Sequence, residues 1–258
     1  MSSIEVQQFT YRHGDVELAG YMAQPSRYPR AGILIVPTIA GPTKLMHDRA
    51  RWLASLGYSA MVCDLYGKGH VEDMREARKL ADELRADAEY YRDRFRCALA
   101  ELRTRSKLAN NRIAAIGYCM GGEIVLEMAR GGEDIALVVS FHGLLATPLP
   151  AKRGTIKARL LVCHGRADPL VPPKQVRDFL EEMDIAGADC HMHIYSGVLH
   201  GFTDISSNSR AVEAVRYNAS ADRQSKAAML SMFDELFENK KHRTNIRPGV
   251  PVAFGRFI

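Results

Sequence analysis

Three segments of the 258-residue chain carry side chains that could perform covalent chemistry together. In the first, Cys119 lies between Gly117 and Gly121, directly after the apolar run 113–116. Apolar residues at near-helical spacing follow it. A sharp turn from strand to helix would place the thiol at a helix N-terminus, where unpaired N–H groups and the helix dipole lower a thiol pKa. The pattern fits a nucleophile on such a turn and fits equally an ordinary turn with an inert, buried cysteine.

The other two segments lie downstream, and each follows a strand-like run. Asp168 comes shortly after the apolar run 159–163, and His200 follows the alternating run 191–195. Nucleophile, acid and histidine in this chain order are typical of one class of hydrolase triad. His200 would accept the thiol proton, and Asp168 would orient the imidazole.

Each of these residues also has a plainer interpretation. Asp168 precedes Pro169, and Asp-Pro is a turn signal. His200 is one of nine histidines, most of which are expected to be structural. Asp204 is a competing carboxylate for the histidine and Glu123 a weaker one. Glu123 is better interpreted as a residue of the first helical turn, where its charge would oppose thiolate formation.

The chain resembles the dienelactone hydrolase family, on the segments 117–122, 164–168, 200–202 and 64–67. The similarity runs from about Ile4 to about Phe237. It implies an α/β-hydrolase fold, a Cys-Asp-His triad formed by Cys119, Asp168 and His200, and neither a metal nor an organic cofactor.

The oxyanion hole of such an enzyme needs two backbone donors. The N–H of Met120, directly after the nucleophile, is the expected first donor. The resemblance implies the N–H of Ile39 as the second. The candidates for the substrate pocket are Thr38, Tyr118, His142 and Phe202, and His164 is expected to be structural.

Two departures from the family put the substrate in question. Family members carry a glutamate that pairs with the resting cysteine, and Thr38 stands at the matching position. We therefore expect His200 to activate Cys119 directly, as an ion pair. The arginine that grips a substrate carboxylate in the family is replaced by Asp204. The possible substitutes are Arg75, Arg78, Arg85 and Arg210.

The apolar patterns predict one α/β domain over residues 1–239, with a basic tail at 240–258. Segments 4–9 and 16–22 alternate with period two and predict an antiparallel N-terminal hairpin. Continuous apolar runs predict a mostly parallel central sheet covered by helices on both faces. The expected strands are 31–36, 58–63, 113–116, 135–141 and 159–163. The expected helices are 43–56, two helices within 71–107 with a break before Tyr90, 173–185 and 219–238.

Composition limits the class of function. The net charge of +5 includes no dense basic tract, which argues against nucleic-acid binding. Five cysteines with no C-x-x-C pair fit a reducing cytoplasm. No leader peptide and no membrane-spanning segment are expected, and the oligomeric state is left as monomer or homodimer.

These observations predict a cytoplasmic hydrolase of a small ester or lactone that works through a cysteine nucleophile and an acyl-enzyme. A general carboxylesterase or thioesterase on the same scaffold is an alternative. A non-catalytic binding protein is another, because fold does not fix function. A thiol redox sensor at Cys119 is a third, although no second cysteine is obviously placed to resolve it.

Overall fold

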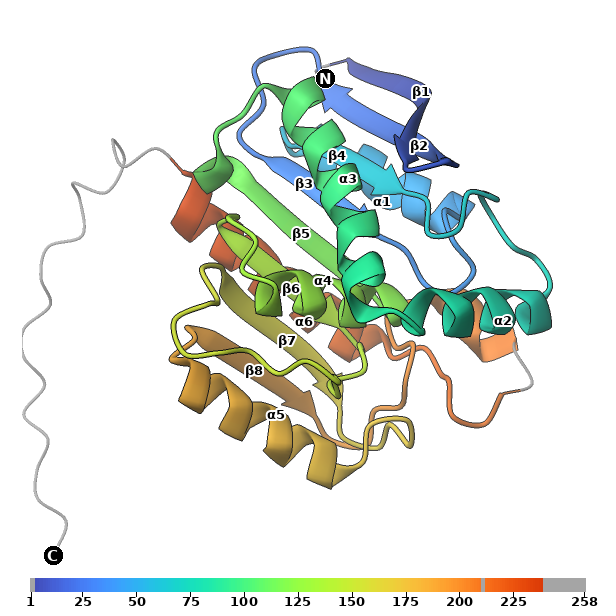
Figure 1. Ribbon diagram of the computed structural model, residues 1–258, viewed down its shortest axis with the longest axis vertical. Helices are drawn as coiled ribbons and strands as arrows, with labels where there is room; N and C mark the ends of the chain where they lie inside the picture. Colours follow the sequence, from blue (N-terminus) through green and yellow to red (C-terminus); the bar gives the residue numbers. More distant parts are fainter. Residues whose placement is uncertain (1–2, 210–211, 239–258) are drawn as a thin grey trace, which may run out of the picture.

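The computed structural model describes residues 3–209 and 212–238, and these form a three-layer α/β fold (Figure 1). The strands are β1 (Ile4–His13), β2 (Val16–Pro25), β3 (Gly32–Val36), β4 (Ser59–Cys63), β5 (Ile113–Tyr118), β6 (Leu137–Phe141), β7 (Arg159–Gly165) and β8 (Cys190–Tyr195). The helices are α1 (Lys44–Ser55), α2 (Met74–Arg85), α3 (Ala88–Ser106), α4 (Met120–Arg130), α5 (Pro173–Ala186) and α6 (Ala219–Phe237).

The strands form one sheet in the order β1-β2-β4-β3-β5-β6-β7-β8. β1 pairs with β2, and β2 with β4, in antiparallel register. The other neighbours are parallel. The predicted α/β-hydrolase fold with an antiparallel N-terminal hairpin is therefore confirmed, and β5 lies in the middle of the parallel part.

Alternate residues of the central strands face opposite sides of the sheet and belong to two separate cores. Leu34 and Val36 of β3 pack with residues of α2, α3, α4 and α5. Ile33 and Ile35 pack with residues of α1 and α6. Figure 1 shows the same arrangement, with α3, α4 and α5 in front of the sheet and α1 and α6 behind it. Since both faces are covered, the strands are apolar without interruption.

The long charged segment forms two helices, as predicted. α2 ends at Arg85, and Asp87 caps α3 by accepting hydrogen bonds from the N–H groups of Glu89 and Tyr90. An aspartate at this position satisfies donors that the new helix leaves free. The break allows α2 to turn away from α3 toward the end where the parallel strands finish (Figure 1).

Some boundaries differ from the expectations. β6 begins at Leu137 because Ile135 still belongs to a turn, in which its N–H donates to the carbonyl of Glu133. The loop after His200 contains a 3-10 helix at Ile205–Ser209. The tail and the boundary at residue 239 lie outside the described residues. Within the described residues, no helix is both long and apolar enough to cross a bilayer.

A buried ion cluster joins α3, α4 and α5 in front of the sheet. Glu127 of α4 accepts from Arg92 of α3 at 2.9 Å and from Arg130 at 2.8 Å. Arg130 also pairs with Glu182 of α5 at 2.7 Å. Glu127, Arg92 and Arg130 are all buried. Buried charges are tolerated only when they are paired and hydrogen-bonded, so the cluster holds the three helices in one arrangement.

Replacing Glu127 by alanine is expected to lower the free energy of unfolding by about 3–5 kcal/mol, because two buried guanidinium groups lose their shared carboxylate. Chemical denaturation monitored by circular dichroism measures this loss. The matched control is Asp178→Ala, which removes the carboxylate of the exposed Lys174–Asp178 pair on α5. That change should cost less than about 1 kcal/mol. Equal costs for the two variants would contradict a structural role for the cluster.

Candidate active site

The junction between β5 and α4 places Cys119 at the N-terminus of α4 in a strained conformation. Its φ is 55° and its ψ is −117°, a combination that non-glycine residues rarely adopt. A Cβ on Gly117 would overlap the backbone of Gly121, and a Cβ on Gly121 would overlap the carbonyl oxygen of Val36. The two glycines therefore let the turn be tight enough to direct the thiol outward from the sheet.

Asp168 and His200 meet beside this junction. Oδ2 of Asp168, in the loop after β7, lies 2.7 Å from Nδ1 of His200, in the loop after β8. Oδ1 of Asp168 accepts from the N–H of Leu170 at 2.9 Å, which fixes the carboxylate. Both side chains are buried. A carboxylate at this distance assigns the proton to Nδ1, so that Nε2 is the nitrogen free to exchange a proton with a substrate or a nucleophile.

The thiol and the imidazole change each other's charge state. Burial raises the pKa of the Cys119 thiol, but His200 and the N–H groups of Met120 and Ile39 lower it more, and the net pKa lies below the ordinary value. Burial lowers the pKa of His200, but Cys119 and Asp168 raise it to about 10. Nε2 of His200 has no hydrogen bond of standard geometry to a described residue. Contacts between catalytic groups are often long before a substrate binds.

The two expected oxyanion donors both affect the thiol of Cys119. The N–H groups of Met120 and Ile39 each lower its pKa. The hydroxyl of Tyr66 donates to the carbonyl oxygen of Ile39 at 3.1 Å and lies 3.3 Å from the sulfur of Met120. Tyr66 thus connects the loop after β3 to the first turn of α4, although the sequence alone did not single it out.

The competing carboxylates lie elsewhere. Oδ1 of Asp204 accepts hydrogen bonds from the N–H and the hydroxyl of Ser206. Glu123 forms a two-pronged ion pair with Arg85 of α2, at 3.0 and 2.7 Å. Arg85 therefore balances the charge that was expected to oppose thiolate formation. Arg75 and Arg78 are exposed on α2, and Arg210 lies outside the described residues.

The predicted pocket residues are more buried than a pocket lining would be. Tyr118 stacks on Phe141 with ring centroids 4.8 Å apart, and it packs in the core behind the sheet. Phe202 and His142 are also buried. Thr38, after β3, is half-buried. Thr38 therefore lies in the expected oxyanion loop, next to Ile39, and the other three residues are almost entirely buried.

Two further residues, Arg49 and Thr203, contact this region, and neither belongs to a motif of the sequence. Arg49 of α1 is buried and donates to both the carbonyl oxygen and the hydroxyl of Thr203, at 2.7 and 3.0 Å. Thr203 lies three residues after His200. The one available signal was the place of Arg49 on the inner side of its helix, beside Ala50 and Leu53. A charged residue on an apolar helix face indicates a specific partner.

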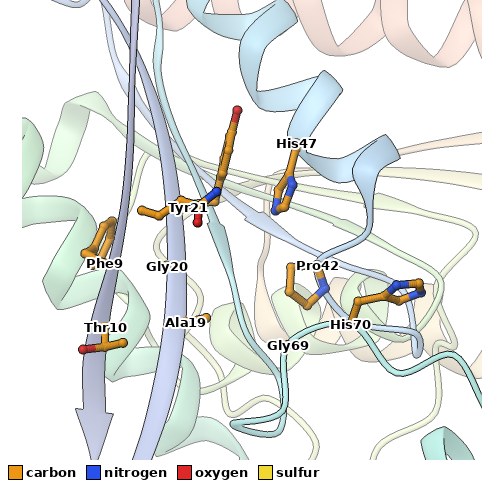
Figure 2. Close-up of a pocket in the computed structure, with 10 residues that line it drawn as sticks. Phe9, Thr10, Ala19, Gly20, Tyr21, Pro42, His47, Gly69 and His70 are labelled. Carbon is orange, nitrogen blue, oxygen red and sulfur yellow. The ribbon is translucent and has the colours of Figure 1, made fainter.

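A separate hollow of about 480 Å³ opens between the N-terminal hairpin and the loops after β3 and β4 (Figure 2). Its lining includes Tyr21, His47, Pro42 and His70. The rings of Tyr21 and His47 stack at 4.0 Å. None of the proposed triad lines this hollow, and the site at Cys119 is the better candidate because its titratable groups meet there. Among the described residues, no group of three or more metal-binding side chains could hold an ion.

Comparison with known proteins identifies the family that this chain is similar to. The profile of the dienelactone hydrolase family matches residues 18–237. Carboxymethylenebutenolidase of Pseudomonas putida is 26% identical over 201 residues, which cover 75% of this chain and 84% of that protein. The uncharacterized protein K02A2.1 of Caenorhabditis elegans is 34% identical over 151 residues, which cover 56% of this chain and 92% of that protein.

Two solved structures share the whole fold. The protein named m3DLH has a TM-score of 0.86 and 32% identity, and the match covers 91% of this chain and 99% of that chain. The dienelactone hydrolase-like promiscuous phosphotriesterase P91, from metagenomic libraries, has the same TM-score and coverage at 30% identity. The chain therefore belongs to the dienelactone hydrolase family, and it is a carboxylic ester hydrolase of the ester- and lactone-cleaving kind.

Proposed function

We propose that this hydrolase cleaves a small carboxylic ester or lactone through an acyl-enzyme on Cys119. The observation that carries the proposal is the contact of Asp168 with His200 at 2.7 Å beside a thiol whose pKa His200 lowers. A thiol activated in this way, with its base oriented by a third group, is the arrangement of covalent acyl transfer.

In the first half-reaction, the thiolate of Cys119 attacks the carbonyl carbon and a carbon–sulfur bond forms. Negative charge develops on the carbonyl oxygen, where the N–H groups of Met120 and Ile39 would stabilise it. The carbon–oxygen bond of the ester then breaks, and the leaving alkoxide takes the proton held by His200. In the second half-reaction, His200 removes a proton from water, the hydroxide attacks the thioester, and the thiolate leaves.

The residue at position 38 bears on how the thiol is activated. Thr38 stands where family members have a glutamate, and a threonine hydroxyl cannot accept the thiol proton at neutral pH. His200 is the proton acceptor in this proposal, and the resting state is a thiolate–imidazolium ion pair. The raised pKa of His200 and the lowered pKa of Cys119 both favour that state.

The resting ion pair predicts rapid alkylation of Cys119 by iodoacetamide at about pH 6, well below the pKa of an ordinary thiol. His200→Ala should slow this labelling by at least about tenfold, because only the N–H groups of Met120 and Ile39 then oppose the effect of burial, which raises the thiol pKa. Peptide mapping by mass spectrometry assigns the labelled residue. Cys163 is the internal reference, since burial raises the pKa of its thiol to about 12.

The matched control is His191→Ala, which removes a half-exposed histidine on β8 that pairs with Asp189. It should leave the labelling rate of Cys119 unchanged. Labelling that begins only above about pH 8 in the unaltered protein would exclude the resting ion pair.

Turnover of p-nitrophenyl acetate should fall by about 10³-fold or more in Cys119→Ala and in His200→Ala, because each removes a group that acts in every cycle. Steady-state kinetics measures the loss. A quenched reaction analysed by mass spectrometry should show one acetyl group on Cys119. Cys97→Ala, a half-buried cysteine of α3, is the matched control and should retain activity.

Retained turnover in Cys119→Ala would overturn the nucleophile assignment. No turnover and no adduct in the unaltered protein, over a panel of esters, thioesters and lactones, would favour a binding protein. A phosphotriester belongs in the panel, because the P91 relative is described as a promiscuous phosphotriesterase.

The charge at the mouth of the site bears on the substrate. Arg85 is the one arginine of α2 among the possible substitutes that reaches α4, and Glu123 already neutralises it. The backbone N–H of Glu123 donates to the carbonyl oxygen of Cys119 at 3.3 Å, so the ion pair lies one helical turn from the thiol. We therefore propose that the substrate is uncharged near α2, since a carboxylate would have to displace Glu123.

Glu123→Gln should release Arg85 and lower the KM for a carboxylate-bearing lactone by about threefold or more, while the KM for p-nitrophenyl acetate changes little. Parallel kinetics on the two substrates measures the difference. Glu133→Gln is the matched control, because it removes the partner of Arg96 at the far end of α4. Equal changes in KM for both substrates would contradict the role of this ion pair.

A further inference from the structure

A second imidazole, His142, lies against the active-site junction and has no part in the mechanism above. It follows β6, is buried, and has a φ of 44°. Its Nδ1 accepts a hydrogen bond from the backbone N–H of Cys119 at 3.1 Å, and the same N–H also donates to the carbonyl oxygen of Phe141 at 3.0 Å. Its ring meets the ring of His200 edge-on, with centroids 5.1 Å apart. His142 therefore contacts the nucleophile residue and the base residue at once.

The hydrogen bonds determine the tautomer of His142. A backbone N–H can only donate, so Nδ1 must carry a lone pair. The remaining proton of the neutral ring is then on Nε2, which lies 2.9 Å from the hydroxyl oxygen of Thr203. Nε2 donates to that oxygen. Protonation of Nδ1 would bring two donors face to face and break the contact with Cys119.

Arg49 makes protonation unfavourable. Its guanidinium donates to the same hydroxyl of Thr203 at 3.0 Å and to the Thr203 carbonyl at 2.7 Å. It also stacks on the ring of Tyr118 at 3.6 Å. The charged or titratable groups that face His142 are thus Arg49 from α1, Tyr118 from β5, and Cys119 and His200 from the catalytic loops. Burial, His200 and Arg49 lower the pKa of His142 well below its ordinary value.

We propose that Arg49 and Thr203 hold His142 as a positioning residue, neutral and protonated on Nε2, so that Nδ1 anchors the strained backbone of Cys119. This inference rests on the proposed role of Cys119 as nucleophile. Two imidazoles lie side by side, and only His200 takes up the thiol proton. Because the residues at both ends of the Nδ1 contact have positive φ, the contact stabilises two backbone conformations that are unfavourable separately.

The first test uses the unaltered protein and needs no activity. Long-range ¹H–¹⁵N spectra assign the tautomer of each histidine ring, and His142→Gln identifies the signals of residue 142. The expected result is a neutral ring protonated on Nε2 from about pH 5 to about pH 8. A ring protonated on Nδ1, or one that titrates near its ordinary pKa, would overturn the proposal. Neither outcome depends on whether Cys119 is the nucleophile.

The second test is the pH profile of kcat/KM for p-nitrophenyl acetate in Arg49→Met. Without the guanidinium, His142 takes up a proton more readily and repels the His200 imidazolium. Its contact with the N–H of Cys119 is then lost, and that N–H keeps only the carbonyl oxygen of Phe141. The ratio of activity at about pH 5.5 to that at about pH 8 should fall about threefold or more below the ratio of the unaltered protein. Combining Arg49→Met with His142→Asn should remove this extra loss of activity at low pH, because the side chain of residue 142 can then no longer be protonated.

Two controls separate charge from packing. Arg51→Met removes an exposed arginine of the same helix and should keep the unaltered profile. Arg49→Lys keeps a cation and should also keep the profile, even if overall activity falls. An Arg49→Met profile with the unaltered shape would overturn the proposal. If Arg49→Met does not fold, the tautomer of His142 in the unaltered protein still tests the proposal.

Discussion

The steric limit at the turn between β5 and α4 is the constraint on which the rest of the site depends. Gly117 and Gly121 leave no room for a Cβ, so the chain can reverse within two residues and present Cys119 at the first turn of a helix. That position gives the sulfur a backbone donor at Met120 and puts it on the edge where the loops after β3, β7 and β8 converge. The positive φ of Cys119 is an unfavourable conformation that the surrounding contacts maintain.

Charge is balanced locally around this turn. In the proposed resting state, the thiolate of Cys119 faces the imidazolium of His200, and Asp168 accepts a hydrogen bond from that imidazolium at 2.7 Å. In the first turn of α4, Arg85 of α2 balances the charge of Glu123. An isolated buried charge costs far more than one that has a partner. A family member with a glutamate near the resting cysteine adds one more negative charge to this balance. With Thr38 in that place, the thiolate depends on one imidazole and on neutral backbone donors.

The parts of the site that the sequence predicted are those with local causes. Gly117, Cys119 and Gly121 form a motif with a steric reason, and Asp168 and His200 each follow a strand, so the parallel sheet had to bring their loops to one edge. Tyr118 shows the limit of this reasoning. It was expected in the pocket beside Cys119, but strand alternation directs it to the core behind the sheet. The contact of Arg49 with Thr203 joins a helix to a loop 154 residues away, and no local pattern encodes such a pairing.

The local balance of charge also explains why a buried arginine, Arg49, lies behind this site. Arg49 contributes no proton and touches neither the proposed nucleophile nor the proposed base. It lies against Tyr118, which precedes Cys119, and against Thr203, three residues after His200. A cation there favours the neutral form of the imidazole of His142 without approaching the sulfur. If His142 could also be charged, the thiol proton would have two acceptors, and only one of them is oriented by a carboxylate. A single acceptor oriented by Asp168 is what acyl transfer requires, because the same nitrogen must give the proton to the leaving group and later take one from water.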